Sequence, residues 1–142
     1  MIFCKNENDE IPVLQIYDVI GETRNEDGSI SGISGKEFAE YLTFIEKQNK
    51  KGIEVHINSL GGSIVDGMTI YSAIKSCSIP VDTVCVGIAV SMAGVILQAG
   101  RCRKMVPWGG LRTQLSEGDK RTHQSPGECF GSGFKASVYG RL

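Results

Sequence analysis

Histidine is scarce in this sequence. The chain of 142 residues has two histidines, His56 and His123, and neither lies at a recognisable metal-ligand spacing from a second ligand. Its five cysteines are widely and irregularly spaced, without a Cys-x-x-Cys pair, so they indicate neither a zinc site nor a disulfide framework. We therefore expect reduced thiols, no bound metal and no cofactor.

Long apolar runs and an excess of charge of either sign are also missing. No apolar segment has the length needed to span a bilayer, and residues 1–10 lack the basic and then apolar pattern of a secretory signal. The formal net charge is −1 at pH 7, which favours neither nucleic acid nor an anionic membrane as a partner. These absences predict a cytoplasmic protein with no nucleic-acid or membrane partner.

The residues that are present fit one globular domain. The hydrophobic fraction is 41% and the charged fraction 22%, which are ordinary values for such a domain. We expect a flexible N-terminal segment at 1–10, a folded α/β domain at 11–107 and an irregular segment at 108–142. The last boundary is placed where the sequence becomes rich in glycine, serine and charge and loses its periodicity.

Strand and helix patterns alternate along the predicted domain. A capping box formed by Ser34 and Glu37 begins the first helical pattern, which ends before Gly52. The expected strands are 11–20, 53–58, 81–86 and 102–106, and the later expected helices are 63–77 and 91–99. A polar loop or hairpin is expected at 21–32. This order predicts an α/β fold with mainly parallel strands and right-handed crossovers.

Ser91 lies where an apolar strand meets an apolar helix, in the stretch VGIAVSMAGVILQAG at 86–100. The first N–H groups of a helix have no intrahelical partner and carry partial positive charge, which suits an oxyanion forming beside the serine. Ser91 is therefore a candidate nucleophile. The alternative is that Ser91 only caps the helix, since serine is a preferred capping residue.

A turn with paired glycines, Ser59-Leu60-Gly61-Gly62, follows an earlier predicted strand. Glycines leave backbone N–H groups accessible, although a plain strand-to-helix turn has the same composition. Because parallel strands end at one edge of a sheet, we expect this turn and Ser91 to share a site. His56 precedes the turn and is expected to be structural, because its neighbours supply no acidic group to orient it.

Two segments together, INSLGGSIVDGMTIYSAI at 57–74 and the stretch at 86–100, resemble the proteolytic subunit of Clp proteases and its phage-encoded head-maturation relatives. The resemblance covers roughly residues 11–107. It implies the Clp protease/crotonase-like spiral of ββα units and a serine endopeptidase that cleaves peptide or protein substrates. It also implies a homo-oligomeric ring, served by an ATP-dependent unfoldase or acting on a capsid precursor.

By this resemblance Ser91 matches the family's nucleophile, and the N–H groups of Gly61 and Met92 match its oxyanion hole. The family's histidine falls near residues 113–114, where this chain has none, so His123 is the candidate base. The family's aspartate falls beyond residue 142.

We therefore expect a family member that is truncated or altered after about residue 110, with little or no peptidase activity. A shifted reading frame near Gly110 is one hypothesis for the altered segment. Two alternatives remain open, namely a catalytically silent structural or regulatory subunit of a Clp-like assembly and a crotonase-like enzyme acting on CoA thioesters.

Overall fold

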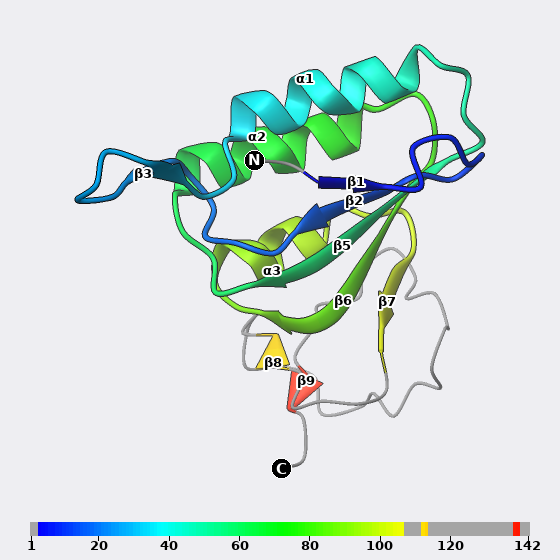
Figure 1. The fold of residues 1–142 in the computed structure, drawn as a ribbon. Helices are drawn as coiled ribbons and strands as arrows, with labels where there is room; N and C mark the ends of the chain where they lie inside the picture. Colours follow the sequence, from blue (N-terminus) through cyan, green and yellow to red (C-terminus); the bar gives the residue numbers. More distant parts are fainter. Residues whose placement is uncertain (1–2, 107–111, 114–137, 140–142) are drawn as a thin grey trace.

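The computed structural model of the protein describes residues 3–106, 112–113 and 138–139. The strands are β1 (Phe3–Lys5), β2 (Val13–Ile16), β3 (Thr23–Arg24), β4 (Ile30–Ser31), β5 (Ile53–Ser59), β6 (Val81–Ala89), β7 (Arg103–Met105), β8 (Arg112–Thr113) and β9 (Val138–Tyr139). The helices are α1 (Gly35–Glu46), α2 (Ile64–Ser76) and α3 (Met92–Leu97), as Figure 1 shows.

The main sheet is mostly parallel, as the alternation of strands and helices predicts. Within the described residues its strand order is β1-β2-β5-β6-β8-β9, and β7 also pairs with β6. β2, β5 and β6 run parallel, and both β7 and β8 are parallel to β6. Antiparallel strands occur at its edges, β1 on β2 and β9 on β8. The fold is therefore α/β, and the carboxyl ends of β5 and β6 lie at one edge.

The helices pack on this sheet through one apolar core. α1 and α2 lie side by side over the sheet (Figure 1), and α3 contacts α2, β5 and β6. Ser34 caps α1 by accepting a hydrogen bond from Glu37 N–H, and Ser63 caps α2 in the same way from Asp66 N–H. Phe38 of α1 is fully buried in the core, which is worth about 3 kcal/mol relative to its exposure.

The N-terminal segment differs from expectation. Residues 1–10 were expected to be flexible, but Phe3–Lys5 form β1 and pair antiparallel with β2, with Cys4 opposite Leu14. Lys50 Nζ also donates hydrogen bonds to the carbonyls of Glu7 (2.7 Å) and Asp9 (2.9 Å). The expectation of a loose segment is therefore wrong for these residues. The polar composition of the segment does not reveal that part of it pairs with another strand.

Other boundaries also shift. β2 occupies only Val13–Ile16 of the expected strand at 11–20, whereas β6 continues through Ala89, beyond its expected end. The polar segment at 21–32 contains the β3–β4 hairpin, as predicted. Residues 108–142 contain β8 and β9, and the rest of that segment lies outside the described residues.

The cysteines differ from expectation at one position. Cys4, Cys77 and Cys85 are free thiols, but Cys102 is disulfide-bonded. Spacing along the chain does not determine which sulfur atoms meet in space, and this is why the sequence failed to indicate a disulfide. Among the described residues, no helix combines the length and apolar character that crossing a bilayer requires.

Candidate active site

The predicted site lies where β5 and β6 end. Ser59, the last residue of β5, aligns with Ala89, the last residue of β6. The N–H of Val90 donates to the Ser59 carbonyl at 3.1 Å, so the two strand ends are joined just before Ser91. The strand order therefore brings the glycine turn and the serine to one edge, as the sequence predicts.

Gly61 lies directly against the turn that carries Ser91. A Cβ atom added at Gly61 would lie 2.7 Å from Val90 O and 3.0 Å from both Met92 N and Ser91 Cβ. Gly61 also has φ +98°, a conformation that residues with a side chain rarely adopt. Both the lack of room for a side chain and the backbone conformation therefore require glycine at position 61. The backbone segments that carry Gly61 and Met92, the predicted oxyanion donors, lie against each other.

Ser91 adopts a strained backbone conformation. Its φ is 53° and its ψ −123°, and its side chain is exposed. A residue other than glycine in such a region costs about 1–3 kcal/mol. A strained turn between a strand and a helix is the device that exposes the serine hydroxyl of a nucleophile elbow. The Ser91 side chain makes no capping hydrogen bond, so the alternative that it only caps α3 is wrong.

Met92 begins α3 and offers a free donor. Ala93 N–H bonds to Val90 O, and Gly94 N–H bonds to Ser91 O. Among the described residues the Met92 N–H has no hydrogen-bond acceptor, as expected in a first helical turn. The Met92 side chain packs on Gly67 of α2, where an added Cβ would lie 2.1 Å from Met92 Cγ.

The Gly61 backbone is held from both sides. Its carbonyl accepts from Ile20 N–H at 2.9 Å, and its N–H donates to Ser59 Oγ at 3.1 Å. Ser59 Oγ in turn donates to the Asp18 carbonyl at 2.7 Å. The sequence interpretation did not single out Ser59. The available signal was a serine at the end of a strand, directly before a glycine turn.

His56 has an acidic partner, contrary to expectation. Its Nε2 lies 2.5 Å from Glu54 Oε1, and Lys104 Nζ lies 3.5 Å from Glu54 Oε2. The hydrogen bond from His56 is the main reason that the pKa of Glu54 is held below its usual range. His56 alternates along β5 with buried Val55 and Ile57, so it lies on the opposite face of the sheet from the core. Its interpretation as structural agrees with this position, but the reason given was wrong.

The candidate base His123 lies outside the described residues, as does Gln114. Thr113 of β8 pairs with Ala89, two residues before Ser91. The segment where the resemblance places the family's histidine is therefore next to β6 at the site edge. Among the described residues, no cluster of side chains is suited to hold a metal ion.

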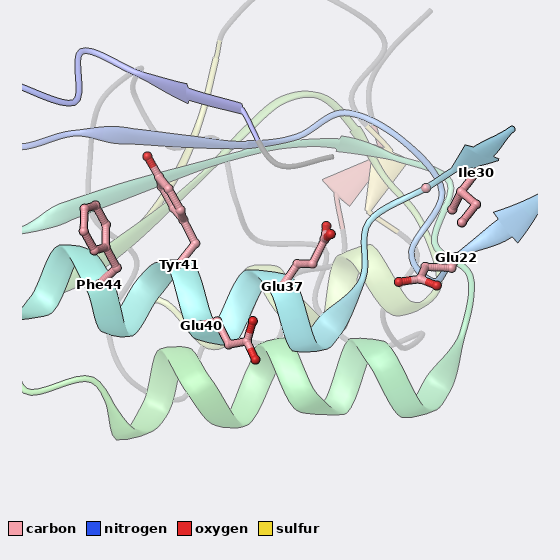
Figure 2. Close-up of a pocket in the computed structure, with 7 residues that line it drawn as sticks. Glu22, Ile30, Glu37, Glu40, Tyr41 and Phe44 are labelled. Atoms are coloured by element: carbon pink, nitrogen blue, oxygen red, sulfur yellow. The ribbon is translucent and has the colours of Figure 1, made fainter.

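A pocket of about 640 Å³ lies elsewhere, between the β3–β4 hairpin and α1 (Figure 2). It is lined by Glu22, Ile30, Gly32, Glu37, Glu40, Tyr41 and Phe44. None of the predicted site residues lines it. This pocket is therefore separate from the Ser91 site.

Comparison with known proteins decides the family. A family model described as Clp protease matches residues 14–116. The chain belongs to the Clp protease family. The resemblance inferred from the segments at 57–74 and 86–100 is thereby confirmed.

Relatives of known name and structure agree with this assignment. The ATP-dependent Clp protease proteolytic subunit of Carsonella ruddii is 31% identical over 114 residues, which cover 80% of this chain and 55% of that protein. A mutant of ClpP1 from Listeria monocytogenes has the same fold, with a TM-score of 0.57 and 23% identity over 75% of this chain and 57% of that one. The ClpP protease catalytic domain from Plasmodium falciparum has a TM-score of 0.57 and 26% identity, covering 74% and 55% of the two chains. This Clp protease chain thus spans about half the length of the relatives it matches.

Proposed function

We propose that the Ser91 site performs acyl transfer, and that this Clp protease chain is a serine endopeptidase subunit acting on peptide or protein substrates. One observation carries the proposal, which is the strained and exposed Ser91 lying against the Gly61 turn. Strain of this kind persists only where the surrounding structure holds it, and it is frequent at active sites. Membership of the Clp protease family supports the same reaction.

The reaction follows from these groups. Ser91 Oγ forms a bond to the carbonyl carbon of a peptide, and the carbonyl electrons move onto its oxygen. That oxyanion accepts a hydrogen bond from Met92 N–H, worth about 3–4 kcal/mol in the transition state. Gly61 N–H is the second proposed donor, and it has to leave Ser59 Oγ, to which it donates in the structure, to take this role. The amine leaves with a proton, and water then hydrolyses the acyl group from Ser91 to restore the hydroxyl.

The proton on Ser91 Oγ needs an acceptor about 3 Å away. We propose His123 for this role, since the other histidine, His56, is bound to Glu54 on the far face of β5. Without such a base a serine is a weak nucleophile at neutral pH, and the rate falls by several orders of magnitude. The proposed peptidase is therefore slow unless His123 reaches Ser91.

Assembly and partners are part of the same proposal. The name of the Carsonella relative supports an ATP-dependent unfoldase as partner. If the chain acts like the phage-encoded proteases that its sequence resembles, a capsid precursor is the corresponding substrate. Leu60, Ile64 and Val65 expose 68%, 72% and 78% of their surface beside the glycine turn. Apolar side chains gathered in this way are typical of contact surfaces, which supports self-association. By resemblance to the family we propose a homo-oligomeric ring and a cytoplasmic setting.

A catalytically silent subunit of a Clp-like assembly is the second candidate. It is favoured by the pairing of His56, the one histidine among the described residues, with Glu54 rather than with Ser91. A crotonase-like enzyme is less well supported, because holding a thioester oxyanion requires no strained serine. Binding of an acyl-CoA would favour that third reading.

Fluorophosphonate labelling separates the first two candidates. The probe forms a covalent bond only with an activated serine hydroxyl. We expect labelling of the wild-type chain, loss of labelling in Ser91→Ala, and unchanged labelling in the control Ser72→Ala, which alters an exposed serine on α2. A further variant, His123→Ala, is expected to label more slowly. Absence of labelling in folded wild-type protein contradicts the peptidase and supports the silent subunit.

A further inference from the structure

We propose that Asn58 is a positioning residue for Ser91, because its side-chain oxygen holds a bulge in β6 that sets where the Ser91 turn begins. Asn58 acts through the backbone of β6 and not on a substrate. Its role therefore rests on the proposed acyl-transfer function of Ser91.

The pairing of β5 with β6 changes register just before the candidate site. The two strands are paired one residue for one as far as Ile57, which lies opposite Cys85. The next aligned pair is Ser59 with Ala89. Two steps along β5 thus correspond to four steps along β6, so β6 carries two extra residues in a bulge. Bulges are frequent next to active sites, where they re-aim a side chain.

The bulge limits how far β6 extends beyond the edge of the sheet. Each residue of a strand advances the chain by about 3.3 Å. With one-for-one pairing Gly87 would lie opposite Ser59, and Ser91 would lie about 7 Å further along the strand direction. In the structure Ser91 Cβ instead lies 3.0 Å from the place of a Cβ added at Gly61. The position of Ser91 beside the glycine turn therefore depends on the bulge.

The side chain of Asn58 reaches from β5 to this bulge. Asn58 Oδ1 accepts a hydrogen bond from Ile88 N–H at 3.0 Å. Gly87 leaves the room that this contact needs, because a Cβ added there would collide with Asn58 Oδ1 and lie 2.9 Å from Asn58 Cγ. The three atoms nearest to such a Cβ all belong to the Asn58 side chain. Asn58 and Gly87 thus form one matched contact across the bulge.

Core packing does not account for Asn58. The residue is exposed, whereas its neighbours Ile57 and Ser59 are buried. Its contact with β6 is a hydrogen bond from a side chain to the backbone, three residues before Ser91. Loss of the side-chain oxygen should therefore loosen the bulge and leave the core intact. The expected consequence is a Ser91 turn that occupies its reactive position less often.

Amide hydrogen exchange and fluorophosphonate labelling together test this role. In Asn58→Ala we expect the Ile88 amide to exchange about three- to tenfold faster and Ser91 to label more slowly by a similar factor, the size of one net hydrogen bond. Asn58→Asp keeps the oxygen acceptor and should restore both rates. Asn58→Leu keeps the volume without the acceptor and should behave like Asn58→Ala. The control Asn25→Ala removes an asparagine that bonds to Ser29 in the β3–β4 hairpin, and it should change neither rate.

Gly87→Ala tests the same contact from the other strand. Its Cβ displaces the Asn58 side chain, so this variant should slow the labelling of Ser91 about as much as Asn58→Ala does. In the double variant Asn58→Ala/Gly87→Ala the obstruction is gone, and labelling should be no slower than in Asn58→Ala. Fully additive effects of the two substitutions contradict a shared role.

Two results overturn the role of Asn58, namely an unchanged labelling rate in Asn58→Ala and a wild-type rate in Asn58→Leu. The backbone amide chemical shifts of Ser91 and Met92 separate this proposal from the proposed function. If even the wild-type chain is not labelled at Ser91, the acyl-transfer function fails. The chemical shifts then still decide the positioning role. They move in Asn58→Ala and return in Asn58→Asp if Asn58 positions the turn, and they stay unchanged if it does not.

Discussion

Replacing Gly61 with alanine should damage both the fold and the candidate site. The new Cβ would lie 2.7 Å from Val90 O, closer than Cβ atoms come to other heavy atoms in real proteins. It would also lie 3.0 Å from Met92 N, which is at the limit of observed Cβ contacts. The φ of +98° adds a conformational cost of about 1–2 kcal/mol for a residue with a Cβ. Displacement of the neighbouring backbone adds about 1–3 kcal/mol. We expect Gly61→Ala to lose about 2–5 kcal/mol of unfolding free energy.

Gly28→Ala is the matched control. Gly28 also has a positive φ, +81°, but a Cβ added there meets nothing within 4 Å. This variant should show the conformational cost alone, about 1–2 kcal/mol, and leave the Ser91 site unchanged.

Urea unfolding of the two variants and fluorophosphonate labelling of Ser91 measure these effects. The difference between Gly61→Ala and Gly28→Ala isolates the close approach of Gly61 to the Ser91 turn. Equal loss of stability in both, with full labelling retained in Gly61→Ala, would refute the reasoning that the two segments adjoin.

Three further changes test other parts of the structure. Gly67→Ala places a Cβ 2.1 Å from Met92 Cγ and should cost about 1–3 kcal/mol in thermal unfolding by overpacking α2 against α3. Glu54→Gln weakens the bond to His56 and should lose about 1 kcal/mol at pH 7. Since the folded pKa of Glu54 is lowered, its stabilisation is present above the unfolded value of 4.5 and is lost as the pH falls through the folded pKa. The difference in urea unfolding between the two proteins should therefore shrink steadily as the pH is lowered below 4.5. Burial raises the pKa of Cys85 to about 11, so a thiol reagent at pH 8 should not modify Cys85 until the chain unfolds.

Much of the fold could be predicted because its signals are local. Ser34 and Ser63 cap helices at points where a serine precedes an amphipathic pattern. The apolar strands could be predicted because β-branched residues are concentrated in them. Alternation of these elements then predicts the parallel sheet and its site edge. Pairing of β1 with β2 was missed because it depends on residues that are distant in sequence and on backbone hydrogen bonds that composition does not encode.

The candidate site was predicted in its members but not in its details. Nothing local distinguishes a capping serine from one with a φ of 53°, because the strain at Ser91 is held by contacts of the whole turn. The Glu54–His56 pair was readable, since residues two apart on a strand share a face. Ser59 was overlooked because its hydroxyl meets the Asp18 carbonyl, a partner that only the fold brings near.

The central claim is that Ser91 is the nucleophile of an acyl-transfer site. Intact-mass measurement of the full chain after fluorophosphonate treatment tests it most directly, followed by mapping of the modified peptide. The account predicts one adduct per chain, located at Ser91 and absent from Ser91→Ala. A folded wild-type chain that stays unmodified, or that carries the adduct at another serine, would contradict it.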